Sequence, residues 1–195
     1  MNSEKFLKQI EFLKEIDKAK EVYRQSKIIG MKRCENDAEH SWHAAVMLII
    51  LREYFDDKAD TLKALKMMLM HDLVEIYAGD TPCYDETLRS TQKQREKAAA
   101  QRLYSILPSE QREEMISLYN EFEEGRTMEA QICNIMDRLQ PTMLIDGDNG
   151  VSWKERSVLK KQVIERDKIA LEGPDEISKY VENVICKAHE NGYLK

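Results

Sequence analysis

The run LKALKMMLMHDLVEIYAG at residues 62–79 restricts the fold of this chain more than any other feature. Its apolar residues cover most sides of a helix, as expected at the centre of a helical bundle. Asp60 or Thr61 can cap the first turn, and Gly79 can end the helix with left-handed backbone. The run therefore predicts a helix over about 61–78 that is surrounded by other helices.

The rest of the chain predicts more helices and no strand. A helix over 4–26 buries a face with three- and four-residue spacing, formed by Phe6, Ile10, Leu13, Ile16, Ala19 and Val22. Gly30 and the polar run 33–37 form a loop, and a helix from Ala38 turns inward Val46, Ile49, Ile50 and Tyr54. Further helices are expected at about 88–106, 109–125, 129–145, 153–168 and 174–188. With 7 Gly and 4 Pro in 195 residues, the composition also favours one all-α domain.

The formal net charge of −6 argues against a general nucleic-acid binder, because such proteins depend on clustered Lys and Arg. A small phosphate ester stays possible if a cation and one or two basic residues reverse the potential locally. The amino terminus lacks the apolar core of a signal peptide, and no segment has 18 unbroken apolar residues. We therefore expect a cytosolic protein without a membrane span, with reduced, mostly buried thiols at Cys34, Cys83, Cys133 and Cys186.

His71 and Asp72 lie inside the apolar run, where ionisable groups are costly unless they are paired or metal-bound. Metal ligation is one explanation. Glu75 projects toward the same face one turn later, and Asp80 follows the helix end, from which a turn can lean it back over the site. The alternative interpretation is that Asp72 and Glu75 are solvated and Asp80 only forms a turn.

Two other residues complete a candidate ligand set. His40 begins the second predicted helix, three residues before His43, and Asp137 lies in the apolar context CNIMDRLQP. A hydrogen-bonded histidine and an Asp137–Arg138 ion pair are the alternatives. His189, in the polar tail, is expected to have no role.

The ordered set His40, His71-Asp72 and Asp137 resembles the H…HD…D signature of the HD-domain metal-dependent phosphohydrolases. The blocks EHS, HDLVE, GDTP and DRLQP, which begin at residues 39, 71, 79 and 137, are similar to the branch that contains 5′-deoxynucleotidases. The resemblance implies an all-helical HD-domain bundle in a single domain over 1–195. Its metal core covers about 5–170, and a C-terminal helix follows at about 174–191.

The resemblance also implies an activity, a cofactor and a site. One divalent cation (Mn, Co, Fe, Zn or Mg) binds His40, His71, Asp72 and Asp137. Glu75 and Asp80 act in catalysis, and an Arg of the first helix, with Arg24 as the nearest candidate, binds the phosphate. The expected reaction is release of phosphate from (deoxy)nucleoside 5′-monophosphates by a homodimer. Two alternatives stay open: hydrolysis of a signalling nucleotide or cyclic phosphodiester, and a non-catalytic, metal-containing binding protein. The basic stretch 154–161 is an interface or a solvated face.

Overall fold

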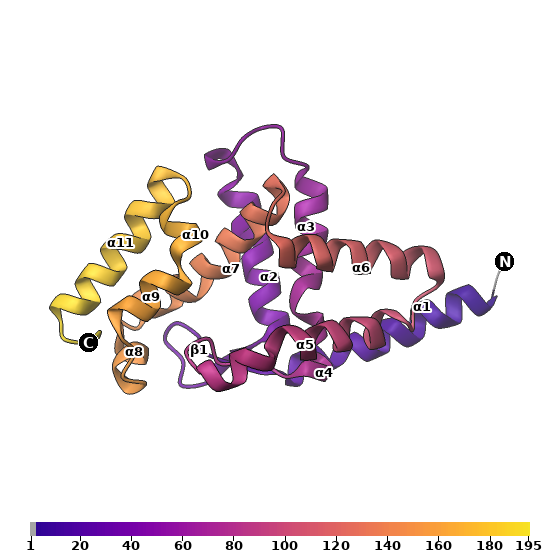
Figure 1. The fold of residues 1–195 in the computed structure, drawn as a ribbon, viewed down its shortest axis with the longest axis horizontal. Coiled ribbons are helices and arrows are strands. Elements are labelled where there is room, and N and C mark those ends of the chain that lie inside the picture. Colours follow the sequence, from indigo (N-terminus) through magenta and orange to yellow (C-terminus); the bar gives the residue numbers. More distant parts are fainter. Residues whose placement is uncertain (1–2) are drawn as a thin grey trace.

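The computed structural model describes residues 3–195, most of which are helical, so the all-α prediction is confirmed (Figure 1). The first four helices of the described chain are α1 (Ser3–Glu15), α2 (Asp37–Ile50), α3 (Thr61–Met70) and α4 (Glu75–Ala78). They are followed by α5 (Glu86–Tyr104), α6 (Ser109–Glu124) and α7 (Met128–Gly147). The chain then forms α8 (Val151–Glu155), α9 (Lys160–Arg166), α10 (Lys168–Leu171) and α11 (Asp175–Glu190). Short 3₁₀ turns lie at Ile16–Glu21, Arg52–Tyr54 and His71–Val74.

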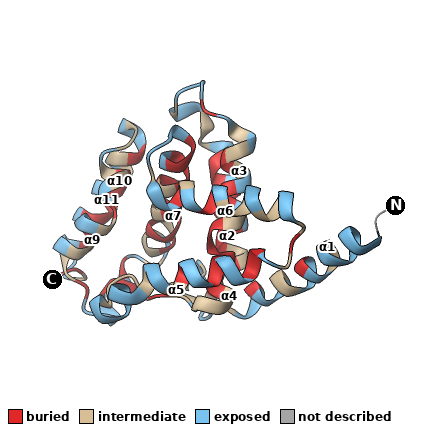
Figure 2. Cartoon of the chain, turned by 45° about the vertical axis from the view of Figure 1, so that its right-hand side comes forward, coloured by how far each residue is buried: buried red, intermediate tan, exposed pale blue. Residues whose placement is uncertain are grey.

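Helix α7 is at the centre of the packing, in contact with α2, α3, α6, α10 and α11. Its side chains join a large apolar core that includes Leu48 of α2 and Met68 of α3. A second apolar cluster forms around Leu103 and Tyr104 of α5, and Figure 2 shows buried residues concentrated where these helices meet. Because Leu62 and Leu69 of α3 are exposed, the apolar run of residues 62–79 is less enclosed than its composition predicts.

The helix predicted over 61–78 is interrupted at the residues of chemical interest. Asp60 caps it as predicted, accepting a hydrogen bond from the Lys63 amide at 3.0 Å. After Met70 the backbone tightens into the 3₁₀ turn His71–Val74, and α4 then ends before Gly79, which has a φ of 75°. A 3₁₀ turn has about three residues per turn, so successive side chains diverge by about 120° rather than 100°. This break determines the directions of His71 and Asp72.

The prediction of helix over 4–26 and loop over 33–37 is wrong in one respect. The first helix and its 3₁₀ turn end by Glu21, and β1 (Tyr23–Lys27) pairs antiparallel with β2 (Cys34–Asn36). Arg24 is therefore on a strand, not on the first helix. The helical periodicity ends at Val22, and pairing with a segment ten residues later is a tertiary effect that local propensity does not contain. Helix α1 projects from the bundle toward its N-terminal end (Figure 1), and its Phe6 and Leu13 are exposed.

Helix α2 is rotated relative to the prediction. Val46, Ile49, Ile50 and Tyr54 were expected inside, but all four are exposed. The buried face instead carries Asp37, His40, Ser41, Ala44 and Leu48. Hydrophobicity alone selects the wrong face because polar residues and alanines occupy the inner one.

The C-terminal region is more divided than predicted. The helix expected at 153–168 is split into α8, α9 and part of α10, whereas the terminal helix begins after Pro174 as predicted. The four cysteines are free thiols, but the expectation that most of them are buried is wrong, because Cys133 is buried, Cys34 and Cys83 are half-buried, and Cys186 is exposed. Within residues 3–195, every helix is too short or too polar to cross a membrane.

Candidate metal centre

The structure brings together the four residues that the sequence proposes as metal ligands. His40 comes from α2, His71 and Asp72 come from the 3₁₀ turn after α3, and Asp137 comes from α7. One ligand atom from each of the four lies within 4.8 Å of the others. All four are buried, with His40 at 0% exposure. Residues nearly one hundred positions apart thus meet in one small polar cluster inside the bundle.

A cap at the start of α2 sets the position of His40. The Asn36 side chain accepts a hydrogen bond from the Glu39 amide at 2.9 Å, and the Glu39 carboxylate accepts one from the Asn36 amide at 3.1 Å. This reciprocal capping box fixes the first turn of the helix. His40, one residue further, is thereby directed toward α7.

The distances within the cluster equal or slightly exceed those between neighbouring ligand atoms of a metal ion. Nε2 of His40 is 3.1 Å from Oδ1 of Asp137 and 3.6 Å from Oδ2 of Asp72. Nε2 of His71 is 3.1 Å from Oδ1 of Asp72 and 3.7 Å from Oδ1 of Asp137. Ligands about 2.1 Å from a cation are roughly 3.0–3.4 Å from one another in tetrahedral or octahedral arrangements. The spacing therefore fits a single small cation.

The hydrogen bonds of His71 leave one ring nitrogen for that purpose. Its Nδ1 lies 2.8 Å from the Met68 carbonyl oxygen, which only accepts, so Nδ1 carries the proton. The buried Nε2 makes no hydrogen bond with any residue from 3 to 195. Its lone pair therefore faces the Asp72 carboxylate, an unfavourable contact unless a proton or a cation lies between them.

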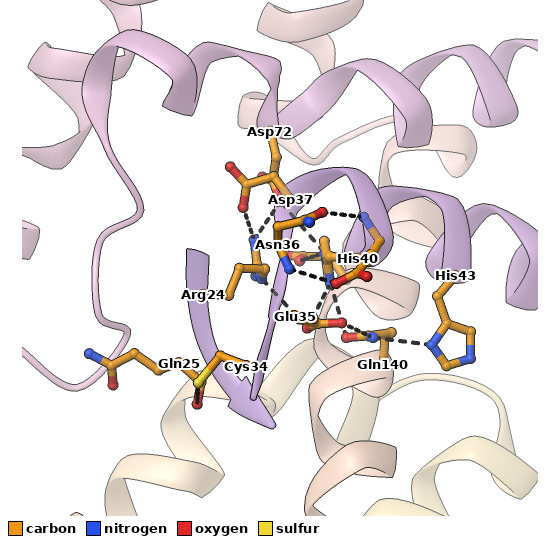
Figure 3. Close-up of polar contacts among 12 residues, drawn as sticks. Arg24, Gln25, Cys34, Glu35, Asn36, Asp37, His40, His43, Asp72 and Gln140 are labelled. Atoms are coloured by element: carbon orange, nitrogen blue, oxygen red, sulfur yellow. Dashed lines mark hydrogen bonds and ion pairs between the residues drawn. The ribbon is translucent and has the colours of Figure 1, made fainter. Parts of the chain in front are cut away.

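His40 is oriented in the same way by Gln140 (Figure 3). The Gln140 amide donates from Nε2 to the Glu35 carboxylate at 2.8 Å, so its oxygen faces Nδ1 of His40 at 3.0 Å. Nδ1 must donate to this oxygen, which leaves the Nε2 lone pair directed at the carboxylates. Second hydrogen bonds of this kind orient histidine ligands in metal sites.

The electrostatics of the cluster also favour a central positive charge. Burial alone lowers the pKa of His71, but Asp72 and Asp137 outweigh it and raise that pKa to about 10. Burial raises the pKa of Asp72, yet the neighbouring His71 and Arg24 hold it below its ordinary value. Two imidazoles and two carboxylates suit divalent metals such as Mn²⁺, Fe²⁺, Co²⁺ and Zn²⁺.

Arg24 reaches the cluster from strand β1. Its Nη1 is 2.6 Å from Oδ2 of Asp72 and 3.4 Å from Oδ1 of Asp37, and its Nε is 3.8 Å from Oε1 of Glu35 (Figure 3). Burial lowers the pKa of Arg24, but the surrounding carboxylates raise it well above its ordinary value. A permanent positive charge therefore lies beside the cluster.

Glu75 and Asp80 border the same region. Glu75 is 7% exposed at the start of α4, and its Oε2 makes no hydrogen bond among the described residues. Burial, reinforced by Asp72, raises the pKa of Glu75 well above its ordinary value. Burial also raises the pKa of Asp80, in the turn after α4, against the opposing effect of Arg24. Both carboxyl groups thus lie beside the cluster without belonging to it.

Sequence reasoning missed three residues of this region, namely Glu35, Asp37 and Gln140. Asp37 is 1% exposed, and burial together with Asp72 raises its pKa to about 7. Its signal was present in the sequence, because it lies three residues before His40 and hence on the same helix face. Gln140 lies three residues after Asp137, but its role depends on contacts with Glu35 and His40, which no local pattern contains. Of the other two histidines, His43 contacts Gln140, and the one hydrogen-bond partner of the His189 side chain within residues 3–195 is the Leu194 carbonyl.

A cavity of about 400 Å³ opens beside the cluster. His71, Asp72 and Asp137 form part of its wall, together with Arg24, Glu75 and Asp80. A substrate in this cavity can reach the cluster, the guanidinium and both extra carboxyl groups.

The sequence profile of the family described as HD domain matches residues 16–177 of the chain. The chain belongs to the HD domain family. The resemblance noted from the sequence is thereby confirmed. A predicted metal-dependent phosphohydrolase from Magnetospirillum magnetotacticum MS-1 has a similar structure, with a TM-score of 0.91 and 36% identity over 97% of this chain and 95% of that one. A Pyrococcus horikoshii OT3 protein shares the fold of this HD domain, with a TM-score of 0.64 and 21% identity over 91% of this chain and 99% of that one.

Curated relatives of this HD-domain chain carry the name 5′-deoxynucleotidase. The human protein HDDC2 is 26% identical over 119 residues, which are 61% of this chain and 54% of that protein. A 5′-deoxynucleotidase from Shewanella oneidensis is 30% identical over 95 residues, 45% of this chain and 49% of that one. The chain thus spans about half the length of these two relatives.

Proposed function

We propose that this chain is a metal-dependent phosphohydrolase that releases inorganic phosphate from (deoxy)nucleoside 5′-monophosphates. The observation that supports this most directly is the pair of buried imidazoles whose Nε2 lone pairs face two carboxylates at the wall of a cavity. The relatives named 5′-deoxynucleotidase support the choice of substrate class.

His40, His71, Asp72 and Asp137 would hold the divalent cation. When bound, such a cation polarises a phosphoryl oxygen and lowers the pKa of a water molecule. The donor set suits Mn, Co, Fe, Zn or Mg to different degrees, so the chemistry of the ligands leaves the identity of the metal open.

The remaining residues of the cavity have distinct tasks in this proposal. Arg24 neutralises phosphate charge, and its position is fixed by Asp72 and Asp37. Glu75 has a buried carboxyl oxygen free of hydrogen bonds, which is placed to exchange a proton with the leaving oxygen or with water. Asp80 positions the sugar hydroxyl or the attacking water from the adjacent turn.

A substrate screen tests this proposal. The purified protein, loaded separately with each candidate metal, is incubated with nucleoside 5′-monophosphates, guanosine tetraphosphate and cyclic dinucleotides. Released phosphate is measured for the monophosphates, and chromatography detects the pyrophosphate or the linear nucleotides that the other two classes would give. We expect release from the monophosphates, and its loss in a His71→Ala, Asp137→Asn double variant. If the protein hydrolyses only guanosine tetraphosphate or a cyclic dinucleotide, the proposed monophosphate substrate is wrong and a signalling nucleotide is the substrate. Absence of turnover with every compound would favour a metal-containing binding protein.

The proposal extends to the whole chain. One HD domain over 1–195 has its metal core at about 5–170 and a C-terminal helix at about 174–191. The protein acts in the cytosol as a homodimer. An uncovered apolar stripe along α2 supports the dimer, since Trp42, Ile49 and Ile50 are 64%, 55% and 67% exposed.

A further inference from the structure

The cavity beside the metal cluster continues to a second group of residues, to which the proposed hydrolysis assigns no role. Tyr84 follows α4, Trp153 lies on α8, and Arg166 ends α9, and all three line the cavity. Figure 1 shows α8 and α9 beside β1. The ion pair between Lys27 and Glu155 and the bond from Arg156 to the Gln25 carbonyl join α8 to that strand. The leaving group of a substrate with its phosphate at the cluster can extend toward this end.

Arg166 has hydrogen-bond donors that no described residue accepts from. Its Nη1 donates to Oδ1 of the buried Asp167 at 2.6 Å, and that carboxylate also accepts from Thr142 at 3.0 Å. Its Nε is buried, and neither Nε nor Nη2 forms a hydrogen bond with any residue from 3 to 195. The Arg166 side chain is only 12% exposed. Since a buried donor without a partner is costly, these groups are suited to an acceptor on a ligand.

Tyr84 adds a third donor. Nε1 of Trp153 lies 3.2 Å from the Tyr84 hydroxyl oxygen, and an indole N–H can only donate. The phenol oxygen is therefore the acceptor in that bond, and its own proton is free for another partner. Burial raises the pKa of Tyr84, so the hydroxyl keeps this proton at neutral pH. Together, Arg166 and Tyr84 offer donors and no free acceptor apart from the second lone pair of the phenol.

The charges at this end of the cavity nearly cancel. Arg166 is paired with Asp167, and the nearby Arg156 and Glu165, which also line the cavity, have opposite charges. A second phosphate would meet no surplus of positive charge here. The group that fits is a neutral one with adjacent hydrogen-bond acceptors.

We propose that Arg166 and Tyr84 bind the base of the nucleotide and select a 6-oxopurine over adenine. The O6 and N7 atoms of a 6-oxopurine are two neighbouring acceptors, which match a guanidinium fork, whereas adenine presents an amino donor at position 6. This inference rests on the proposed nucleotidase function, because it assumes that the leaving group is a nucleoside.

Binding of nucleosides tests the inference without any hydrolysis. Inosine and adenosine differ at position 6 and carry no phosphate. The protein has two tryptophans, so its ¹⁵N spectrum has two indole N–H signals. Trp153 lines the cavity and reports on the base site, whereas Trp42 does not line it and is the reference. With zinc-loaded protein we expect inosine to shift the Trp153 signal and to bind about tenfold more tightly than adenosine. The Trp42 signal stays in place.

Two variants connect that preference to the named side chains. Arg166→Lys keeps the charge beside Asp167 but removes the two-pronged donor, and Tyr84→Phe removes only the hydroxyl. Each is expected to reduce the inosine-to-adenosine ratio severalfold, whereas Arg102→Lys, a matched change on the exposed face of α5, leaves it unchanged. Equal affinity for the two nucleosides in the unmodified protein, or an unchanged ratio in both variants, would overturn the inference. Phosphate release from inosine 5′-monophosphate reports separately on the proposed function.

Discussion

At the scale of single residues, Gln140 controls the direction in which His40 presents its lone pair. The amide is fully buried, and both of its ends are committed, one to His40 and the other to Glu35. An apolar residue of similar size at this position removes the acceptor for Nδ1 of His40. The imidazole is then free to adopt the tautomer whose Nε2 carries a proton and cannot bind a metal.

We therefore expect Gln140→Leu to weaken affinity for divalent metal by about 10- to 100-fold. Calorimetric titration with Zn²⁺ measures the affinity, and the imidazole ¹⁵N shifts of His40 report its tautomer. Gln131→Leu, an exposed position on the same helix, is the control and is expected to change neither quantity. Unchanged affinity and tautomer in Gln140→Leu would exclude the positioning role.

The proposed role of Glu75 makes a different prediction. Glu75→Gln preserves the shape of the side chain but removes the ionisable group, so turnover is expected to fall roughly 100-fold or more while metal content is unchanged. Phosphate release and elemental analysis of the same preparation measure the two quantities. Equal turnover in the variant would remove Glu75 from the mechanism.

Residues in the ordered motif were predictable because ionisable groups in apolar segments need a reason to be there. The sequence nominated His40, His71, Asp72 and Asp137, and the folded chain brings them together. Glu35 and Gln140 were not predictable in the same way. Their importance depends on a hydrogen bond between residues 105 positions apart, which no local pattern contains.

At the scale of elements, helix α5 carries a buried acid close to the cavity. Glu96 is 6% exposed and accepts a hydrogen bond from Gln92 at 2.8 Å. Burial raises its pKa from 4.5 to about 7, although the bond from Gln92 opposes the shift. Because the folded-state pKa lies above the unfolded value, the folded state binds the proton more tightly. The stability that this provides is present below pH 4.5 and is lost as the pH rises through about 7.

Glu96→Gln cannot ionise, so the variant should escape this loss. The free energy of unfolding of the variant minus that of the unmodified protein is expected to be about 2 kcal/mol larger at pH 8.5 than at pH 5.5. Urea denaturation at the two pH values measures the difference. Glu182→Gln, an exposed position on α11, should show no such change. A pH-independent difference for Glu96→Gln would mean that Glu96 titrates normally.

The presence of most helices was predictable from the periodicity of apolar residues. The elements that build the site differ from the structure that this periodicity predicts. The hairpin of β1 and β2 replaces the end of a predicted helix because strand pairing and the ion pairs of Arg24 act between distant segments. The 3₁₀ turn at His71 interrupts an otherwise helical run. Helix α2 faces the core with His40, alanines and Leu48, while Val46, Ile49 and Ile50 face outward. In each case tertiary contacts around the polar cluster override a local preference.

At the scale of the whole molecule, the uncovered stripe on α2 predicts self-association. Ile49→Lys places a charge in the proposed interface, so the variant is expected to elute as a 22.8 kDa monomer, whereas the unmodified protein elutes as a dimer. Size-exclusion chromatography with light scattering measures the masses. Ile164→Lys, a similarly exposed position on α9, is the control. A monomeric unmodified protein would contradict the dimer, and it would leave the metal centre unaffected.

The central claim is that side chains from three separate elements share one cation. Anomalous diffraction from crystals grown with Mn²⁺ tests it most directly. We expect one strong peak about 2.0–2.3 Å from Nε2 of His40, Nε2 of His71 and the carboxylates of Asp72 and Asp137. A well-ordered cluster without a peak, or a peak held by other residues, would contradict it.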